Sequence, residues 1–134
     1  MARLVAVALA LALSGSALAG PFPVDRARTP RALILLQTDL FNAGDWRNLW
    51  LTFSPKFRAR CDFQIWRARL RRDRGSTNPR EKVVELTIKR VGTTKALATY
   101  VVHRNGRFAY SGKNDVYVKI GKRWYDELDH ETEC

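Results

Sequence analysis

The sequence predicts an α+β domain in which three helices precede a curved antiparallel sheet. In the first half of the chain, apolar residues recur at helical spacing, with capping residues before each run and breakers after it. From about residue 84 the apolar period changes to two, which is typical of half-buried strands. An Asn-Gly pair at positions 105–106 is a strong hairpin signal. Helices followed by strands that are joined in hairpins indicate one α+β domain with a single core.

The first predicted helix runs from Pro30 to Ala43. Thr29 is its N-cap, Pro30 takes the first helical position and Gly44 ends it. Apolar residues lie on nearly every side of this helix, which is typical of a helix buried between other elements. We therefore expect it at the centre of the domain.

Two more helices are expected before the sheet. Asp45 caps the second, which ends at Ser54-Pro55, where a short helical turn up to Arg60 can follow. Asp62 caps the third, and Gly75 ends it. The apolar face of the second helix holds Trp46, Leu49, Trp50 and Phe53.

Strands are expected over residues 84–89, 96–103, 108–110, 114–120 and 123–126, with a bulge or bend at Gly112. In the segment 114–120, three apolar residues alternate with Asp115, Tyr117 and Lys119. Period-two geometry allows only one of the two sets to face the core. We expect the apolar set, Val116, Val118 and Ile120, to face inward.

Residues 1–19, MARLVAVALALALSGSALA, predict a cleaved signal peptide. Arg3 precedes an apolar run of about ten residues, and Ala17 and Ala19 occupy the −3 and −1 positions of a cleavage site. The run is too short for the roughly 20 residues that a membrane-spanning helix needs. We expect a secreted or extracytoplasmic protein that starts at Gly20, with a linker over residues 20–28 and one domain over residues 29–134.

The chain is strongly basic, with 24 Lys and Arg against 13 Asp and Glu, a net charge of +11. Such a balance attracts polyanions, and it also arises simply as a solvated surface. No nucleic-acid motif accompanies the charge, so sequence-specific nucleic-acid binding is not expected, whereas an anionic polymer of the cell envelope is a candidate partner. The densest basic region, called here the arginine cluster, comprises Arg58, Arg60, Arg67, Arg69, Arg71, Arg72 and Arg74.

The two cysteines, Cys61 and Cys134, favour a disulfide because an exported protein with an even cysteine count meets oxidising conditions. Free thiols, or pairing of Cys134 with another chain, are the alternatives that the spacing leaves open. The tail after Asp126 is rich in carboxylates, but its spacing matches no known cation-binding loop. No metal and no cofactor are predicted.

Three short strings, NAGDW, LTFSPKFRARC and GKRWYDEL, together with the order of elements, resemble small exported members of the nuclear-transport-factor-2-like superfamily. This superfamily includes ketosteroid isomerases and polyketide cyclases, and the resemblance covers about residues 29–128. It implies a cone, in which the sheet wraps around the first helix and leaves a pocket at the open end. In the enzymes of this superfamily, an acid or base, often an Asp, lies on the face of the sheet toward the pocket. The resemblance also implies a possible homodimer. No string matches a catalytic motif, so the resemblance assigns no catalytic residue.

The sequence therefore predicts an exported, non-catalytic domain that binds a small apolar ligand or a partner segment in the pocket. Two alternatives stay open, a small lyase or isomerase that uses a strand carboxylate, and electrostatic binding to anionic cell-envelope polymers. Paired polar groups converging on the pocket would favour the enzyme, and a lining of Trp, Leu and Val would favour binding. The pocket candidates are Trp46, Trp50, Tyr100, Asp115 and Tyr117, the last two only if their strand turns them inward.

Overall fold

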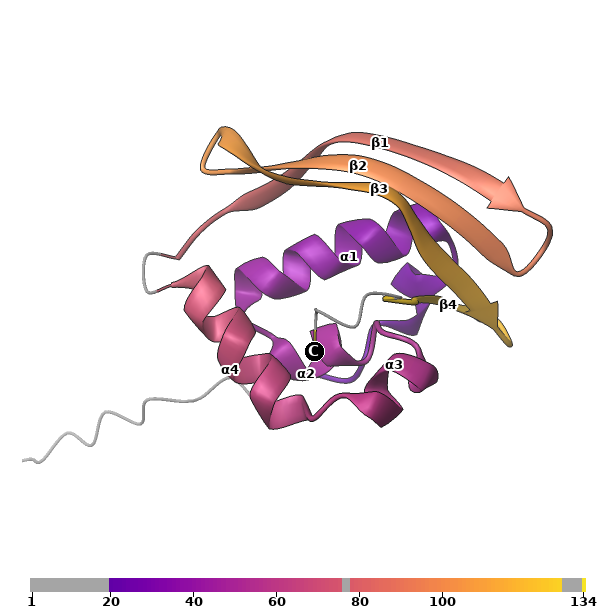
Figure 1. Ribbon diagram of the computed structural model, residues 1–134, viewed down its shortest axis with the longest axis horizontal. Helices are drawn as coiled ribbons and strands as arrows, with labels where there is room; N and C mark the ends of the chain where they lie inside the picture. The colour runs from indigo at the N-terminus through magenta and orange to yellow at the C-terminus, as the bar shows by residue number, and fades with distance from the viewer. Residues whose placement is uncertain (1–19, 76–77, 129–133) are drawn as a thin grey trace, which may run out of the picture.

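A computed structural model describes residues 20–75, 78–128 and 134, and Figure 1 shows a sheet arching over a layer of helices. The α+β class and the order of helices before sheet are confirmed. The predicted signal peptide, residues 1–19, lies outside the described residues. Within the described ranges, no helix is both long and apolar enough to span a membrane. The elements are a 3-10 helix, η1 (Val24–Ala27), the helices α1 (Pro30–Ala43), α2 (Trp46–Trp50), α3 (Pro55–Arg60) and α4 (Phe63–Arg74), and the strands β1 (Glu81–Val91), β2 (Lys95–Arg104), β3 (Arg107–Ile120) and β4 (Arg123–Asp126).

The first helix has the predicted ends. The Thr29 hydroxyl accepts a hydrogen bond from the Ala32 N–H at 3.1 Å, and Gly44 adopts the left-handed conformation at φ 68°. In Figure 1, α1 lies between the sheet and the layer formed by α2, α3 and α4. The central position expected for this helix is confirmed, since it contributes buried residues to the core on both sides.

The described part of the chain has four α-helices, whereas three were expected with a short helical turn up to Arg60 between the second and the third. The second helix stops at Trp50, and Pro55–Arg60 forms a helix of its own, α3, capped by the Ser54 hydroxyl. The residues between α2 and α3 pair with the end of β4. The Asp126 N–H donates to the Thr52 carbonyl, and the Ser54 N–H donates to the Asp126 carbonyl, both at 2.8 Å. These long-range hydrogen bonds take the backbone groups that a longer α2 would have used.

The sheet has the strand order β1-β2-β3-β4, and each neighbouring pair is antiparallel. The hairpin between β2 and β3 turns at Asn105 and Gly106, both with positive φ, as the Asn-Gly pair predicted. The strands expected over residues 108–110 and 114–120 form one strand, β3, and the bulge expected at Gly112 occurs just after it.

A bulge in β3 lies just beyond Gly112 and reverses the predicted faces of the strand. Tyr100 of β2 pairs with Gly112, but Ala98, two residues earlier, pairs with Asp115, three residues later. The extra residue is accommodated by Asn114, whose φ is 56°. As a result Tyr117 is 1% exposed and Ile120 is 51% exposed. The expectation that Asp115 and Tyr117 point outward is wrong, because one inserted residue exchanges the two faces.

The stretch 20–28, expected as a linker, packs against the domain. Ala27, in η1, is fully buried, and the Gly20 carbonyl accepts a hydrogen bond from the Asn48 side-chain amide at 2.9 Å. The Arg123 guanidinium lies 3.5 Å from the centre of the Phe22 ring, a cation–π contact. These contacts join residues 20–28 to α2 and β4.

The predicted disulfide between Cys61 and Cys134 is present, with the two Cα atoms 5.5 Å apart. Cys61 is buried at the junction of α3 and α4, so the bond ties the last residue of the chain to the helical layer. The acidic tail lies partly outside the described residues, at 129–133. Of its described carboxylates, Glu127 pairs with Lys56 at 3.4 Å, and Asp126 lies inside the domain.

Candidate functional site

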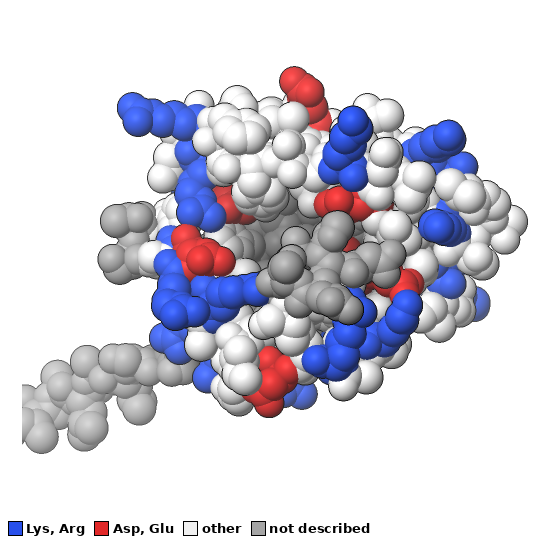
Figure 2. Space-filling view, in the orientation of Figure 1, with Lys and Arg blue, Asp and Glu red and all other residues white. Residues whose placement is uncertain are grey.

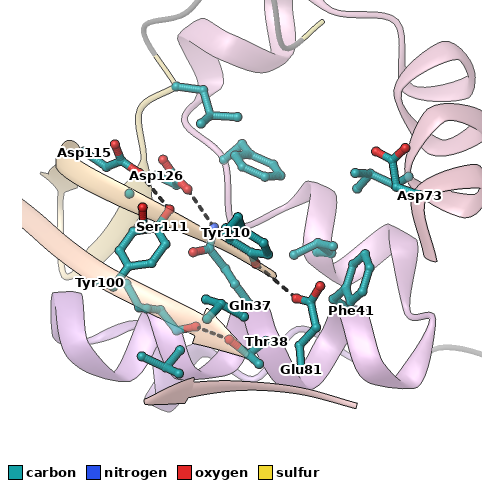
Figure 3. A pocket seen from close by; sticks show the side chains of 18 of the residues that line it. Gln37, Thr38, Phe41, Asp73, Glu81, Tyr100, Tyr110, Ser111, Asp115 and Asp126 are labelled. Carbon is teal, nitrogen blue, oxygen red and sulfur yellow. Dashed lines mark hydrogen bonds between the residues drawn. The ribbon is translucent and has the colours of Figure 1, made fainter. Parts of the chain in front are cut away.

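A cavity of about 790 Å³ lies between the inner face of the sheet and the helices α1 and α4. The space-filling view shows it as a hollow in the face of the molecule (Figure 2), and Figure 3 shows side chains from both layers converging on it. One part of its wall is aromatic and aliphatic, and the other carries hydroxyl, amide and carboxylate groups. The apolar part includes Ile34, Phe41, Phe53, Trp66, Leu70 and Val102.

Three of the five pocket candidates line the cavity, namely Tyr100, Asp115 and Tyr117. The two tryptophans do not. Trp46 packs edge-on against Phe41, with ring centres 5.8 Å apart, and Trp50 lies among the other aromatic rings of the helical layer. Both are partly buried and pack against the core of the helical layer, because their ring contacts are with helices and not with the sheet.

Tyr100 and Asp115 form a polar pair on the sheet wall of the cavity (Figure 3). The Tyr100 hydroxyl donates to Asp115 Oδ2 at 2.7 Å. Burial, and secondly the hydrogen bond to Asp115, raise the pKa of Tyr100 well above its usual value, so the hydroxyl keeps its proton and acts as the donor. Gly112 leaves room for the pair, since a Cβ at this position would overlap both Asp115 Oδ2 and the Tyr100 ring.

A second polar group joins α1 to β4. The Gln37 amide donates to Asp126 Oδ2 and to the Thr52 hydroxyl, both at 3.0 Å. The Tyr117 hydroxyl lies 3.5 Å from Gln37 Oε1, and burial raises the pKa of this tyrosine well above its usual value. These contacts place a neutral amide and a phenol beside the Asp126 carboxylate.

A third polar group is centred on Glu81, whose side chain is nearly inaccessible. Its Oε1 accepts from the Arg104 guanidinium at 2.7 and 3.1 Å, and its Oε2 accepts from the Tyr110 hydroxyl at 3.0 Å. The Asn42 side chain holds the Glu81 backbone through two further hydrogen bonds. The carboxylate is therefore neutralised and held rigidly at the wall.

Sequence reasoning missed Gln37, Glu81, Arg104, Tyr110 and Asp126 as lining residues. Two of them carry a recognisable signal. Gln37 interrupts the apolar surface of a helix predicted to be buried, and Asp126 shares a face of the last predicted strand with Trp124, two residues earlier. A polar side chain in such a position must find a partner or line an internal space.

The arginine cluster divides into separate roles. Arg58 donates to the Phe53 carbonyl, Arg60 to the Leu128 carbonyl, and Arg74 to the Asn42 carbonyl and to Asn78 Oδ1. Arg69 lines the cavity. The outward-facing members are Arg67, which lies over the Phe63 ring, and the exposed Arg71 and Arg72.

We expect Arg67, Arg71 and Arg72 to govern any attachment to anionic surfaces. Each basic residue near such a surface contributes about 1 kcal/mol, so changing all three to Gln should weaken binding to phosphatidylglycerol vesicles roughly a hundredfold. Binding of the unmodified protein should also fall as salt is raised past about 0.1 M, where the screening length is about 10 Å. Vesicle cosedimentation measures both effects. The matched control changes the exposed sheet residues Lys82, Lys89 and Lys119 to Gln, and an equal loss there would show that only net charge matters.

Comparisons of the chain with protein-family models, with curated proteins and with solved structures find no match. The fold and the site therefore define the class of protein, an α+β domain whose antiparallel sheet covers a cavity with a mixed aromatic and carboxylate wall. The resemblance to the nuclear-transport-factor-2-like superfamily stays a prediction.

Proposed function

We propose that this protein is an exported binding domain of the nuclear-transport-factor-2-like type, and that its cavity takes a small, mainly apolar molecule. The proposal is supported by the arching of the sheet over α1 and by the hollow between the two layers (Figures 1 and 2). These features agree with the cone and pocket that the resemblance implies. The disulfide agrees with an oxidising, extracytoplasmic location.

The observation that carries the proposal is the cavity itself. Its volume of about 790 Å³ lies within the roughly 300–1,000 Å³ typical of small-molecule sites. Phe53, Trp66 and Leu70 form part of an apolar wall, and burying a ligand against such a surface is favourable by roughly 25 cal/mol per Å². A molecule with an apolar body therefore fits this space best.

The polar wall is compatible with an apolar ligand, because most of its groups already have partners within the protein. Glu81 is bound by Arg104 and Tyr110, and Gln37 is bound to Asp126 and Thr52. These groups keep their hydrogen bonds when an incoming ligand displaces water from the cavity, so the ligand does not have to supply new ones. The lining is nevertheless not exclusively apolar, so ligand binding is not the sole function that it supports.

Proton transfer is the second candidate function, and the pair formed by Tyr100 and Asp115 favours it. A carboxylate facing a cavity can accept a proton from a bound molecule, and the Tyr100 phenol, which donates to Asp115 Oδ2, holds this carboxylate in place. Tyr100 and Asp115 are also two polar groups that converge on the pocket, which is the arrangement expected to favour an enzyme. In this alternative the protein is a small lyase or isomerase, and Asp115 is its base.

The neutral fluorescent probe N-phenyl-1-naphthylamine tests whether the cavity takes apolar molecules. We expect it to bind the purified, disulfide-bonded protein with a blue-shifted emission, and Leu70→Trp to abolish binding by filling the space. Ile65→Trp is the matched control, because Ile65 lies on the same helix, is 64% exposed and is not among the lining residues. Equal binding by the two variants, or none by the unmodified protein, would contradict the proposal.

A further inference from the structure

We infer that the natural ligand of the cavity carries a cationic amine, which binds the Asp115 carboxylate while the apolar body of the ligand lies against Phe53, Trp66 and Leu70. This inference rests on the proposed binding function and names the chemical class of the ligand. The position of Asp115, its partners and the aromatic groups beside it each contribute to the argument.

Asp115 is a carboxylate of the wall that has an acceptor available for a ligand. Its Oδ2 accepts one hydrogen bond, from the Tyr100 hydroxyl, and the residue is half-buried at the edge of the hollow. In the described parts of the chain, no Lys or Arg nitrogen lies within 4.0 Å of this carboxylate, whereas Glu81 is paired with Arg104. A partly desolvated carboxylate that has no cationic partner gains most from a ligand that supplies one.

The rings beside Asp115 suit a cation and not an anion. The Tyr100 and Tyr110 rings meet edge to face with centres 6.5 Å apart, and Tyr117 lines the same wall. The faces of aromatic rings attract ammonium groups and repel carboxylates. Burial keeps the Tyr100 and Tyr117 hydroxyls protonated by raising their pKa, so these groups add no negative charge, and their oxygens can accept hydrogen bonds from an ammonium group.

The bulge in β3 serves to bring Asp115 to the cavity. Without the extra residue at Asn114, the strand would direct Val116 and Val118 inward and would give a more apolar wall. Gly112 then leaves the space that the Tyr100 ring and the Asp115 carboxylate occupy. Both the irregular backbone and the missing side chain are thus needed to place one carboxylate, which an apolar pocket would not require.

The charges around the hollow are of both signs. Figure 2 shows acidic and basic side chains next to each other at its rim. Arg69 and Lys113 also belong to the lining, so an anionic ligand is the competing possibility. A bound carboxylate would, however, enter a wall that already holds Asp73, Asp115 and Asp126. Repulsion by these groups favours the amine.

The test compares three ligands that share one hydrocarbon body. Phenethylamine, phenethyl alcohol and phenylacetic acid are each used to displace N-phenyl-1-naphthylamine from the disulfide-bonded protein at neutral pH. We expect the amine to bind about tenfold more tightly than the alcohol, since hydrogen bonds to charged groups exceed neutral ones by about that factor, and the acid to bind most weakly. Asp115→Asn should reduce the tenfold preference for the amine over the alcohol to within about twofold.

Glu85→Gln is the matched control, because it removes one carboxylate from an exposed position on β1 outside the cavity. The preference for the amine should persist in this variant. An alcohol or acid that binds as tightly as the amine would overturn the inference while leaving the proposed binding function intact. Persistence of the amine preference in Asp115→Asn would overturn the role of Asp115. If neither the probe nor any of the three ligands binds, the proposed function itself fails.

Discussion

Replacing Cys134 by serine is expected to lower the free energy of unfolding by about 4 kcal/mol. The disulfide closes a loop of 73 residues, and the chain-entropy model assigns a stabilisation of about this size to such a loop. The bond restricts the unfolded chain and also holds the C-terminus against the junction of α3 and α4. Urea denaturation followed by tryptophan fluorescence measures the loss. Adding a reductant to the unmodified protein should reproduce it.

The control for this experiment is Glu127→Gln, which removes the ion pair with Lys56 near the same end of the chain. The Lys56 side chain is largely exposed, and such pairs contribute at most about 1 kcal/mol, so the denaturation midpoint should move little. Thiol titration of the unfolded, unreduced monomer gives an independent check. Two reactive thiols per chain, or equal stability losses in Cys134→Ser and Glu127→Gln, would contradict the account of the crosslink.

Trp66→Ala is expected to destabilise the domain by about 3–5 kcal/mol, the range observed when a large buried ring is removed. Trp66 is 1% exposed and lies at the centre of the aromatic cluster, with ring centres 5.0 Å from Trp50, 5.6 Å from Phe53 and 6.0 Å from Phe63. It also forms part of the cavity wall. The variant should therefore bind N-phenyl-1-naphthylamine more weakly even under conditions where it is fully folded.

Two variants make this prediction specific. Trp66→Phe keeps an aromatic ring in the cluster and should lose less than half as much stability. Trp46→Ala removes a tryptophan that is only partly buried and lies away from the cavity, so its loss should be smaller and its probe affinity unchanged. Denaturation curves of the three variants measure the order. Equal losses at Trp46 and Trp66 would contradict the central role of Trp66.

Local features of the chain were predictable because their causes lie within a few residues. Thr29, Pro30 and Gly44 bound the first helix through capping and backbone preferences, which neighbouring residues determine. The Asn105-Gly106 turn follows from the positive φ that both residues tolerate. The disulfide was predicted from cysteine count and expected compartment, and a chain with two cysteines has one possible intramolecular pairing.

The site was less predictable, because tertiary contacts decide which residues meet. Alternation along β3 predicted Val116 and Val118 inside, but the single residue inserted at Asn114 exchanged the faces and brought Asp115 to the cavity. The end of α2 was likewise decided by pairing of Thr52 and Ser54 with a strand more than 70 positions later. Gly112 marked a bulge or bend in the sequence, but the alternation of apolar residues predicted neither the exchange of faces that the bulge causes nor the early end of α2.

The sequence alone determined the fold class, the ends of the first helix, the Asn105-Gly106 hairpin turn, the strongly basic composition and the single possible disulfide within the chain. The tertiary structure decided which side of the sheet faces the helices, and thereby which polar groups form the wall of the cavity. The physical reason is that capping, turn geometry and composition depend on neighbouring residues. The orientation of a strand depends instead on the register of its pairing with other strands, which a single extra residue reverses.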